Sequence, residues 1–172
     1  MGQSQKLHSL TPEALRCFPF TMFEKATPLL TAGDQTQLNT MTIGWGGVGT
    51  LWSRPVCTVY VRPQRYTYEF MERQDTFTVS VFDEQWGAAM KLCGARSGRS
   101  VDKVKACGFT PAFAGCGAPY FEEAGLVLVC RKLYADDLRP EKFLDPSIDG
   151  AIYPQKDYHR MYIGEVLEIL KK

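Results

Sequence analysis

Residues 55–72 read PVCTVYVRPQRYTYEFME, and this stretch predicts a change from strand to helix. Residues 56–61 are almost all β-branched or aromatic, which is typical of a β-strand. Residues 68–72 are typical of a helix, for which Thr67 is a suitable N-cap. The sequence therefore predicts that a strand runs through a short turn directly into the first turn of a helix.

The turn between them carries Arg62, Arg65 and Thr67. The first N–H groups of a helix have no partner inside the helix and carry partial positive charge. An arginine guanidinium adds a rigid fork of donors that matches phosphate oxygens. The turn therefore predicts an anion site with phosphate as its natural occupant, and the alternative is a solvated turn whose arginines form local salt bridges.

The composition is that of one ordinary globular domain. The chain has 172 residues, of which 45% are hydrophobic and 23% are charged, enough for a sizeable core. A formal net charge of +1 predicts no general attraction to nucleic acid or to an anionic membrane. Residues 2–9 are polar, no apolar signal segment follows, and no run is long enough to span a membrane. We therefore expect a cytoplasmic, single-domain protein over residues 1–172, with an N-terminal extension at 1–20.

The six cysteines show no motif that predicts a metal site or a redox centre. They stand at positions 17, 57, 93, 107, 116 and 130, without a C-x-x-C pair and without a histidine at ligand spacing. In the absence of a secretory signal, buried or free thiols are favoured over disulfides. A redox-active thiol pair is not predicted either, because the vicinal motif is missing.

The other segments predict strands joined by irregular connections and short helices. Alternating apolar residues predict strands at 28–32, 38–47, 75–82, 125–134 and 158–170, with a helical alternative over 164–170. Short helices are predicted at 11–16, at 84–92 between an Asp83 cap and Gly94, and at 101–106, while 110–119 is interpreted as loop. Residues 136–157 form a turn-rich excursion or lid. This pattern favours a mainly antiparallel β-barrel over a doubly wound parallel sheet.

Five motifs in chain order resemble the flavin reductase-like, FMN-binding split-barrel family. They are NTMTIGW at 39–45, VRPQRYTYE at 61–69, FTVS at 77–80, SGR at 97–99 with the following Asp102-Lys103, and HRMYIGEV at 159–166. The resemblance covers roughly residues 28–170 and is strongest to the flavoredoxin-like branch. It implies an antiparallel, Greek-key-like split β-barrel with a few short flanking helices, tightly bound FMN, and a homodimer with flavin sites near the subunit interface.

The residues of these motifs suit the separate parts of FMN. Cationic and hydroxyl side chains suit the phosphate, the 39–42 segment suits the ribityl chain and pyrimidine edge, and an aromatic ring suits the flavin face. The predicted cofactor-binding set is Asn39, Thr40, Met41, Thr42, Trp45, Arg62, Arg65, Tyr66, Thr67, Ser97, Arg99 and Lys103.

Simpler interpretations of some of these residues stay open. Thr40 and Thr42 could form only the solvent face of a strand, and Lys103 could be an ordinary surface lysine. The rings of Trp45 and Tyr66 could be core. For His159 a structural or surface role is favoured, since no carboxylate accompanies it in the motif.

No catalytic side chain is predicted, because neither a G-x-S-x-G nor an H-E-x-x-H motif is present. In a flavoprotein the cofactor carries the chemistry at N5 and the protein positions it. Three functions stay open: an NAD(P)H-dependent flavin reductase that passes electrons to free flavin or an acceptor protein, a flavoredoxin-like electron carrier without a nicotinamide site, and a non-enzymatic FMN storage or sensor protein. No G-x-G-x-x-G motif follows a strand, so NADH or NADPH would bind directly over the flavin.

Overall fold

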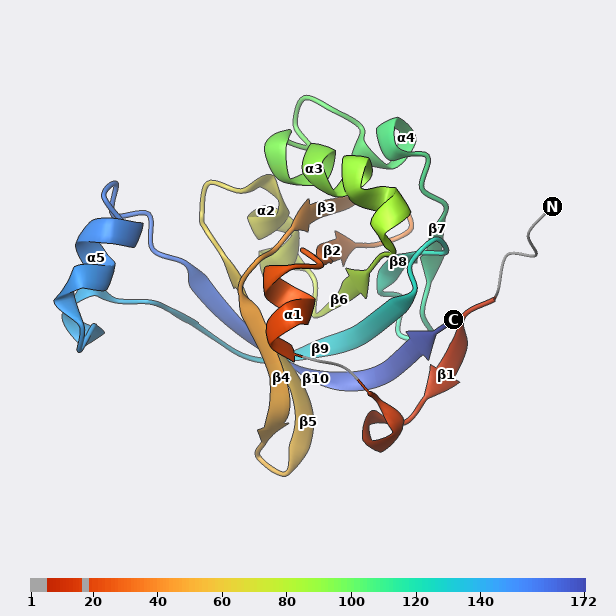
Figure 1. The fold of residues 1–172 in the computed structure, drawn as a ribbon, viewed down its shortest axis with the longest axis horizontal. Helices are drawn as coiled ribbons and strands as arrows, with labels where there is room; N and C mark the ends of the chain where they lie inside the picture. Colours follow the sequence, from red (N-terminus) through yellow and green to blue (C-terminus); the bar gives the residue numbers. More distant parts are fainter. Residues whose placement is uncertain (1–5, 17–18) are drawn as a thin grey trace.

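An antiparallel sheet of eight strands forms the body of the computed structural model, which describes residues 6–16 and 19–172 (Figure 1). The order is β3-β2-β6-β9-β10-β5-β4, and β1 pairs with β10. The strands are β1 (His8–Leu10), β2 (Leu29–Gly33), β3 (Leu38–Thr42), β4 (Gly46–Leu51), β5 (Arg54–Val61), β6 (Thr76–Val81), β9 (Leu126–Asp137) and β10 (Arg160–Lys171). A separate pair consists of β7 (Pro111–Phe113) and β8 (Pro119–Phe121).

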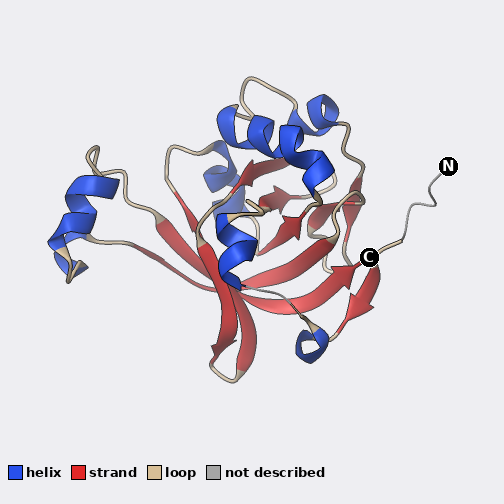
Figure 2. Ribbon diagram, viewed as in Figure 1, coloured by secondary structure: helices blue, strands red, loops and turns tan. Residues whose placement is uncertain are grey.

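In the described part of the chain five short α-helices accompany the sheet, and four of them lie close to it while α5 stands apart (Figures 1 and 2). They are α1 (Pro19–Glu24), α2 (Tyr66–Arg73), α3 (Gly87–Ala95), α4 (Lys103–Cys107) and α5 (Pro146–Ile152). Single 3₁₀ turns occur at Pro12–Ala14, Glu84–Trp86 and Pro140–Lys142. None of the helices in the described part of the chain has the length and apolar content needed to cross a membrane.

The central strands contribute to two core clusters, because successive side chains of a strand point to opposite faces. In β2, Leu30 enters a cluster that includes Phe77 and residues of α1 and α2, whereas Leu29 enters a second cluster with Met90 of α3. Both faces of the sheet are therefore covered. A polar side chain buried on either face needs a hydrogen-bond partner inside the protein. Thr78 has one, since its hydroxyl donates to the carbonyl of Pro119 at 2.6 Å.

The two longest strands, β9 and β10, pair with each other in the middle of the sheet, and their pairing is interrupted at two places. Register shifts occur between Ile163 and Gly164 and between Val166 and Glu168. Such bulges bend the bulged strand and increase its twist. Gly164 leaves space for the Phe77 ring, because a Cβ there would lie 2.7 Å from that ring.

The excursion between β9 and β10 contains α5 and extends away from the sheet (Figure 1). Its base is closed by a hydrogen bond from the Leu138 N–H to the His159 carbonyl, at 2.9 Å. Above this base, stacked rings of Phe143 and Tyr153 pack the excursion together.

The predicted mainly antiparallel β fold is confirmed, and the strand interpretation of residues 164–170 holds, since β10 continues to Lys171. Two strand predictions need correction. The glycine-rich segment after Thr42 turns and continues as the separate edge strand β4, and the 110–119 segment contains β7 and the start of β8 rather than loop alone. The short strands escaped the sequence pattern because so few residues show no periodicity.

The helices also differ from their predicted bounds. The 11–16 segment holds only a 3₁₀ turn, 84–92 begins as a 3₁₀ turn before α3, and the helix predicted at 101–106 is α4 (Lys103–Cys107). Thr67 is not the N-cap of α2; Arg65 holds that position, and the Thr67 hydroxyl accepts a hydrogen bond from Asn39 Nδ2 at 2.8 Å. Gly94 does not end α3 but lies inside it. A Cβ at Gly94 would lie 2.4 Å from Thr42 Oγ1, so the glycine serves the close packing of α3 on β3.

Candidate functional site

A small cavity of about 260 Å³ lies where the strand–turn–helix β5–α2 meets β3 and the end of α3. We call it the basic cavity. The turn places Arg65 at its edge, and the Arg65 N–H donates to the Arg62 carbonyl at 3.0 Å. The lining residues are Asn39, Met41, Thr42, Gln64, Arg65, Tyr66, Thr67, Cys93, Gly94, Ala95, Arg96, Ser97, Gly98 and Lys103.

Three cations line the basic cavity, Arg65, Arg96 and Lys103, and its lining contains no aspartate or glutamate. Lys103 is only 6% exposed, and its ammonium donates to the carbonyls of Thr40 at 2.7 Å and Cys93 at 2.8 Å. Burial lowers the pKa of Lys103, and the nearby Arg65 charge lowers it further. Within the described residues, the side chains of the three cations form no ion pair with a carboxylate.

Of the three cations only Lys103 is buried, and a buried cation without a carboxylate partner is costly. The cavity is therefore a candidate site for an anion. The N-terminus of α2 begins at the same cavity and adds the partial positive charge of a helix start. The prediction of an anion site at this turn thus agrees with the charge distribution. The simpler interpretation of Lys103 as a surface lysine is wrong, because the side chain is buried.

Two glycines allow the walls of the basic cavity to approach each other. Gly94 meets Thr42, and Gly98 meets Asn39, so closely that neither position has space for a Cβ. Asn39 is thereby held between the 97–98 loop and Thr67, to which its amide donates. The glycine positions fix the width of the cavity on the side of β3.

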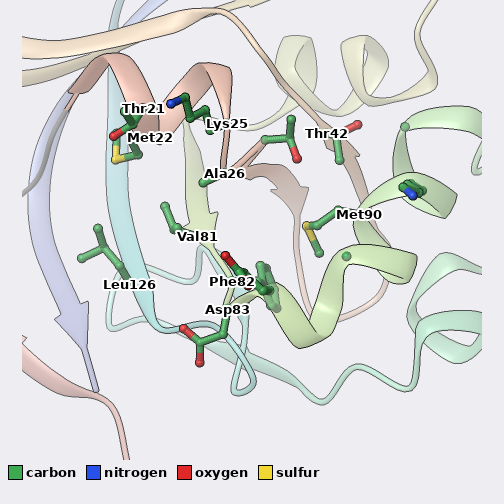
Figure 3. A pocket seen from close by; sticks show the side chains of 15 residues that line it. Thr21, Met22, Lys25, Ala26, Thr42, Val81, Phe82, Asp83, Met90 and Leu126 are labelled. Atoms are coloured by element: carbon green, nitrogen blue, oxygen red, sulfur yellow. The ribbon is translucent and has the colours of Figure 1, made fainter.

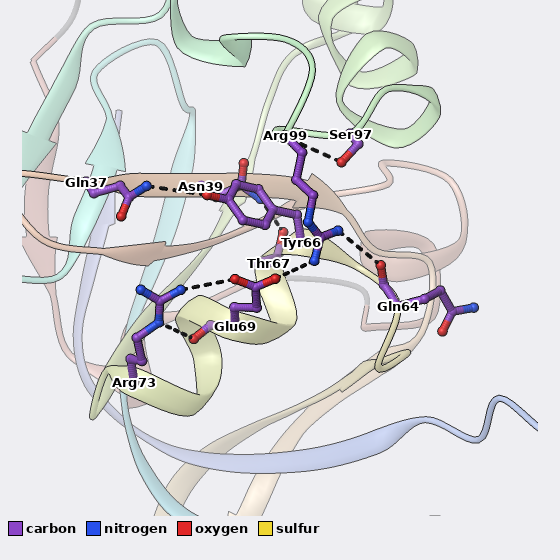
Figure 4. A network of polar contacts seen from close by, with 9 residues as sticks. All are labelled: Gln37, Asn39, Gln64, Tyr66, Thr67, Glu69, Arg73, Ser97 and Arg99. Atoms are coloured by element: carbon purple, nitrogen blue, oxygen red, sulfur yellow. Dashed lines mark hydrogen bonds and ion pairs between the residues drawn. The ribbon is translucent and has the colours of Figure 1, made fainter.

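Arg99 and Ser97 lie at the rim of the cavity, in a network with α2 (Figure 4). The Arg99 guanidinium forms an ion pair with Glu69 and lies over the Tyr66 ring, 4.7 Å from its centroid. The Ser97 hydroxyl accepts a hydrogen bond from the Arg99 N–H at 3.2 Å. The charge of Arg99 is thus already compensated, in contrast to those of Arg65 and Arg96.

A second cavity, of about 180 Å³, shares Met41, Thr42 and Arg65 with the basic cavity, and we call it the adjoining cavity. Its other lining residues are Ile43, Gly44, Trp45, Tyr60, Arg62 and His159. The two cavities share part of their lining and together make up the candidate site. Arg96 and Lys103 line only the basic cavity, Arg62 lines only the adjoining cavity, and Arg65 lines both.

His159 lies against Trp45, with ring centroids 4.7 Å apart, and its Nδ1 shares a hydrogen bond of 2.8 Å with the Tyr153 hydroxyl. Burial lowers the pKa of His159 to about 4, and the Arg62 charge acts in the same direction. The imidazole is therefore neutral near pH 7. A purely surface role, one of the two roles favoured from the sequence, is wrong, since His159 is part of the cavity lining.

Arg62 and Arg65 have different surroundings, although the sequence predicts that both bind the same phosphate. The Arg62 guanidinium forms an ion pair with Asp157, donates to the Ile152 carbonyl at 3.0 Å and lies 5.2 Å from the centroid of the Tyr153 ring. Gln64 donates to the same Asp157 carboxylate. Arg62 thus ties the excursion to the turn and lines only the adjoining cavity.

The structure brings most of the predicted residues together, and the exceptions are Thr40 and Arg99, whose side chains line neither cavity. The Thr40 hydroxyl lies 2.9 Å from the Thr31 hydroxyl and donates to the Leu30 carbonyl, so the side chain faces the core. Only the Thr40 carbonyl is directed to the site, where it binds Lys103. The residues that line one of the two cavities are Asn39, Met41, Thr42, Trp45, Arg62, Arg65, Tyr66, Thr67, Ser97 and Lys103.

Sequence reasoning missed Arg96 and Gly94 as site residues and named Gly98 only as part of the SGR motif. Gly98 belongs to the SGR motif, and a glycine in such a motif indicates that another group approaches the backbone closely. The sequence therefore contained a signal for Gly98. Nothing in the sequence distinguishes Arg96 from any other exposed arginine, because its position depends on where α3 ends.

A larger and mainly apolar cavity of about 810 Å³ lies between α1 and α3 (Figure 3). Met22, Phe82, Met90 and Leu126 are among its lining residues, with Lys25 in the same lining. Thr42 and Gly94 line both this cavity and the basic cavity. Elsewhere among the described residues, no group of three histidine, cysteine, aspartate or glutamate side chains is placed to hold a metal ion.

A family model described as "Flavin reductase like domain" matches residues 21–171, which confirms the resemblance carried by the five motifs. No match to the chain is found among curated proteins.

Solved structures share the fold at low sequence identity. Flavoredoxin from Methanosarcina acetivorans is 23% identical with a TM-score of 0.66, over 84% of this chain and 67% of that chain. The FMN-binding domain of a flavin reductases-like enzyme from Shewanella baltica is 18% identical with a TM-score of 0.68, over 96% and 76%. An NADH:FAD oxidoreductase of Streptomyces globisporus, solved with NAD and FAD fragments, is 19% identical with a TM-score of 0.63, over 84% and 73%.

Proposed function

The chain belongs to the flavin reductase like domain family, and from this premise we propose that it is an FMN-binding oxidoreductase that uses NADH or NADPH. In this proposal it passes electrons to free flavin or to an acceptor protein. Flavin-related oxidoreductase chemistry follows from the family, whereas the nicotinamide donor and the acceptor are the finer part of the proposal.

The basic cavity carries the proposal, because it has three cations and no acidic lining residue. The phosphate of FMN is a dianion, and arginine and lysine donors stabilise it through charge-assisted hydrogen bonds. An ammonium group has three N–H donors, and the carbonyls of Thr40 and Cys93 take two from Lys103. The third is left for a phosphate oxygen, beside Arg65 and Arg96.

The rest of the cofactor fits the direction in which the site continues. The ribityl chain would pass Met41 and Thr42, which line both cavities, and the ring would lie beside Trp45 and His159. Bound flavin supplies a hydride acceptor at N5, so the protein's own task is to hold the ring and exclude water. A neutral imidazole beside the ring adds no positive charge there.

An electron carrier without a nicotinamide site is the second candidate function, and the apolar surface beside Trp45 favours it. Phe20 is 88% exposed and lines, together with Trp45, Phe143 and Ile148, an apolar cavity of about 840 Å³. Exposed apolar patches of this kind are typical of protein–protein contact. A protein electron partner or the second subunit of a homodimer would cover this apolar surface. We also propose a cytoplasmic location for the protein.

Anaerobic stopped-flow absorbance of the FMN-loaded protein separates the candidate functions. Rapid bleaching of the flavin by NADH or NADPH is the result expected for a flavin reductase. Reduction by reduced ferredoxin or flavodoxin but not by the nicotinamides supports the carrier. A flavin that neither kind of donor reduces leaves storage or sensing, and protein that retains no FMN at micromolar concentration contradicts the proposal as a whole.

A further inference from the structure

Two cysteines that are distant in sequence meet behind the basic cavity. Cys93 Sγ in α3 and Cys107 Sγ at the end of α4 lie 3.8 Å apart. Both are free thiols. A disulfide needs a Cβ–Cβ distance near 4 Å and a sulfur–sulfur distance near 2 Å, so a small approach of two short helices is sufficient.

The pair differs from the other cysteines that the structure describes. Cys57 and Cys130 are fully buried in the sheet, where an oxidant in solvent has no access. Cys116 is exposed in the connection between β7 and β8. Only the Cys93–Cys107 pair has one buried thiol and one partly exposed thiol in sulfur–sulfur contact.

The pair is joined directly to the basic cavity. Lys103 begins the short helix that Cys107 ends, and its ammonium donates to the carbonyl of Cys93 at 2.8 Å. The chain between the two cysteines supplies Gly94, Ala95, Arg96, Ser97 and Gly98 to the cavity lining. A bond between the two sulfurs would therefore restrain nearly half of the cavity wall.

We propose that Cys93 and Cys107 form a reversible disulfide, with a hydroperoxide as oxidant, and that this bond fixes the wall of the basic cavity. The disulfide itself is independent of the ligand. Its effect on cofactor retention rests on the proposed FMN site.

Cys107 reacts first, because it is only partly buried whereas Cys93 is 1% exposed. With hydrogen peroxide as the hydroperoxide, the Cys107 thiolate attacks one peroxide oxygen and the O–O bond breaks. The departing hydroxide takes the proton released from the Cys107 thiol, which leaves a sulfenic acid on Cys107 and one water. Cys93 sulfur then attacks Cys107 sulfur, the S–O bond breaks, and the departing hydroxide takes the Cys93 proton. Two thiols and one peroxide thus give one disulfide and two waters. A thiol or dithiol reductant reverses the bond by exchange.

The chemistry of the two sulfurs agrees with this order. Burial raises the pKa of the Cys93 thiol to about 12, with the neighbouring Cys107 acting in the same direction. Cys93 therefore stays protonated in the reduced protein, which leaves Cys107 to react with the peroxide first. In the second step the hydroxide that leaves Cys107 removes the proton of Cys93. The Lys103 charge opposes the rise in the Cys93 pKa, so it favours the loss of the Cys93 proton in the second step.

The test uses the full chain, free of flavin, treated with hydrogen peroxide and then with an alkylating agent. Non-reducing peptide mapping is expected to find the Cys93 peptide joined to the Cys107 peptide, in the wild type and in Cys116→Ser. Cys107→Ser is expected to give no such pair. Oxidation of Cys116 alone, without the joined peptide, would overturn the proposal, since it would show that the peroxide reached the protein.

The consequence is tested on FMN-loaded protein by the rate at which flavin fluorescence appears on dilution. The disulfide is expected to slow FMN release by about fivefold, because a preorganised wall loses less freedom on binding. Cys107→Ser is expected to release FMN at one rate with or without peroxide. An unchanged rate in cross-linked wild type would overturn the effect on the cavity. Protein that forms the disulfide but binds no FMN would instead contradict the proposed function alone.

Discussion

A Cβ atom on Gly98 would lie 1.9 Å from Asn39 Oδ1, so the Asn39 amide occupies the space that any larger residue at position 98 would need. Asn39 in turn donates to Thr67 at the start of α2. The three residues come from β3, the loop before α4 and α2, and their contact holds these elements at the distance that forms the basic cavity.

Gly98→Ala is expected to destabilise the protein by about 1–3 kcal/mol, as overpacking of a close contact does, and to weaken FMN retention because Asn39 must move. Urea unfolding and fluorescence titration with FMN measure the two effects. Gly115→Ala is the matched control, since a Cβ there meets no atom within 4 Å. Equal behaviour of the two variants would contradict the close contact as the reason for the glycine.

Arg65→Ala and Arg96→Ala are each expected to weaken FMN binding by roughly 10- to 100-fold, the loss of one charge-assisted bond of about 1.5–3 kcal/mol. Riboflavin, which lacks the phosphate, is expected to bind both variants nearly as well as the wild type. Arg99→Ala is expected to have a smaller effect, because Arg99 already pairs with Glu69. Isothermal titration with the two flavins measures the difference; a parallel loss for both ligands would argue against a phosphate at this end.

Arg62→Ala is expected to loosen the excursion more than it weakens FMN binding, because Arg62 holds Asp157 and the Ile152 carbonyl. Hydrogen exchange followed by mass spectrometry should show faster exchange over residues 146–158. Lys156→Ala breaks the ion pair with Asp149 inside the excursion and serves as the control with little effect expected. If Arg62→Ala left hydrogen exchange unchanged and weakened FMN binding as much as Arg65→Ala, the result would support Arg62 as a phosphate ligand instead.

His159 makes the folded protein less stable as the pH falls. Its pKa is lowered from 6.5 to about 4, so between these values the unfolded chain binds the proton and the native protein does not. The free energy of unfolding therefore decreases from about pH 6.5 towards pH 4. The full shift corresponds to about 3 kcal/mol, and for a partly exposed ring we expect roughly 1 kcal/mol.

His159→Gln isolates this contribution, because glutamine does not titrate and can still bond the Tyr153 hydroxyl. Urea unfolding at pH 7 and pH 4.5 should show a smaller loss for the variant than for the wild type. Carboxylates with lowered pKa values, such as Asp157, also make both proteins less stable as the pH falls. Their contribution is the same in the two proteins and cancels in the comparison. An identical loss in the two proteins would contradict a buried neutral imidazole.

The strand at residues 56–61 and the helix that follows it could be predicted from the sequence, because β-branched residues and a cap-like turn are local signals. The cationic turn at their junction could be predicted for the same reason, and an anion bound there stays a prediction. The separate destinations of Arg62 and Arg65 could not, since the direction of Arg62 is set by Asp157, 95 residues further along the chain.

Thr40 shows a second limit of the sequence pattern. Alternation places it on one face of a strand but does not say whether that face meets solvent, a ligand or another strand. Thr31 pairs with Thr40 across β2 and β3, and this pairing turns the hydroxyl towards the core. Cys93 and Cys107 show the same limit for side chains on helices, because their contact depends on how α3 and α4 pack.

The hydrogen bond between the Leu138 N–H and the His159 carbonyl closes the excursion at its base. The chain beyond that hydrogen bond is therefore an insert between β9 and β10 that adds no strand to the sheet. Lengthening a surface insert adds little loop-closure entropy, about 0.6 kcal/mol for each doubling. Leu144 is fully exposed in this insert, so the position of Leu144 is a place where a peptide tag or a different partner-recognition segment can be grafted without removing the ring stack of Phe143. The grafted protein would keep β9 and β10 in register and change only what the molecule docks against.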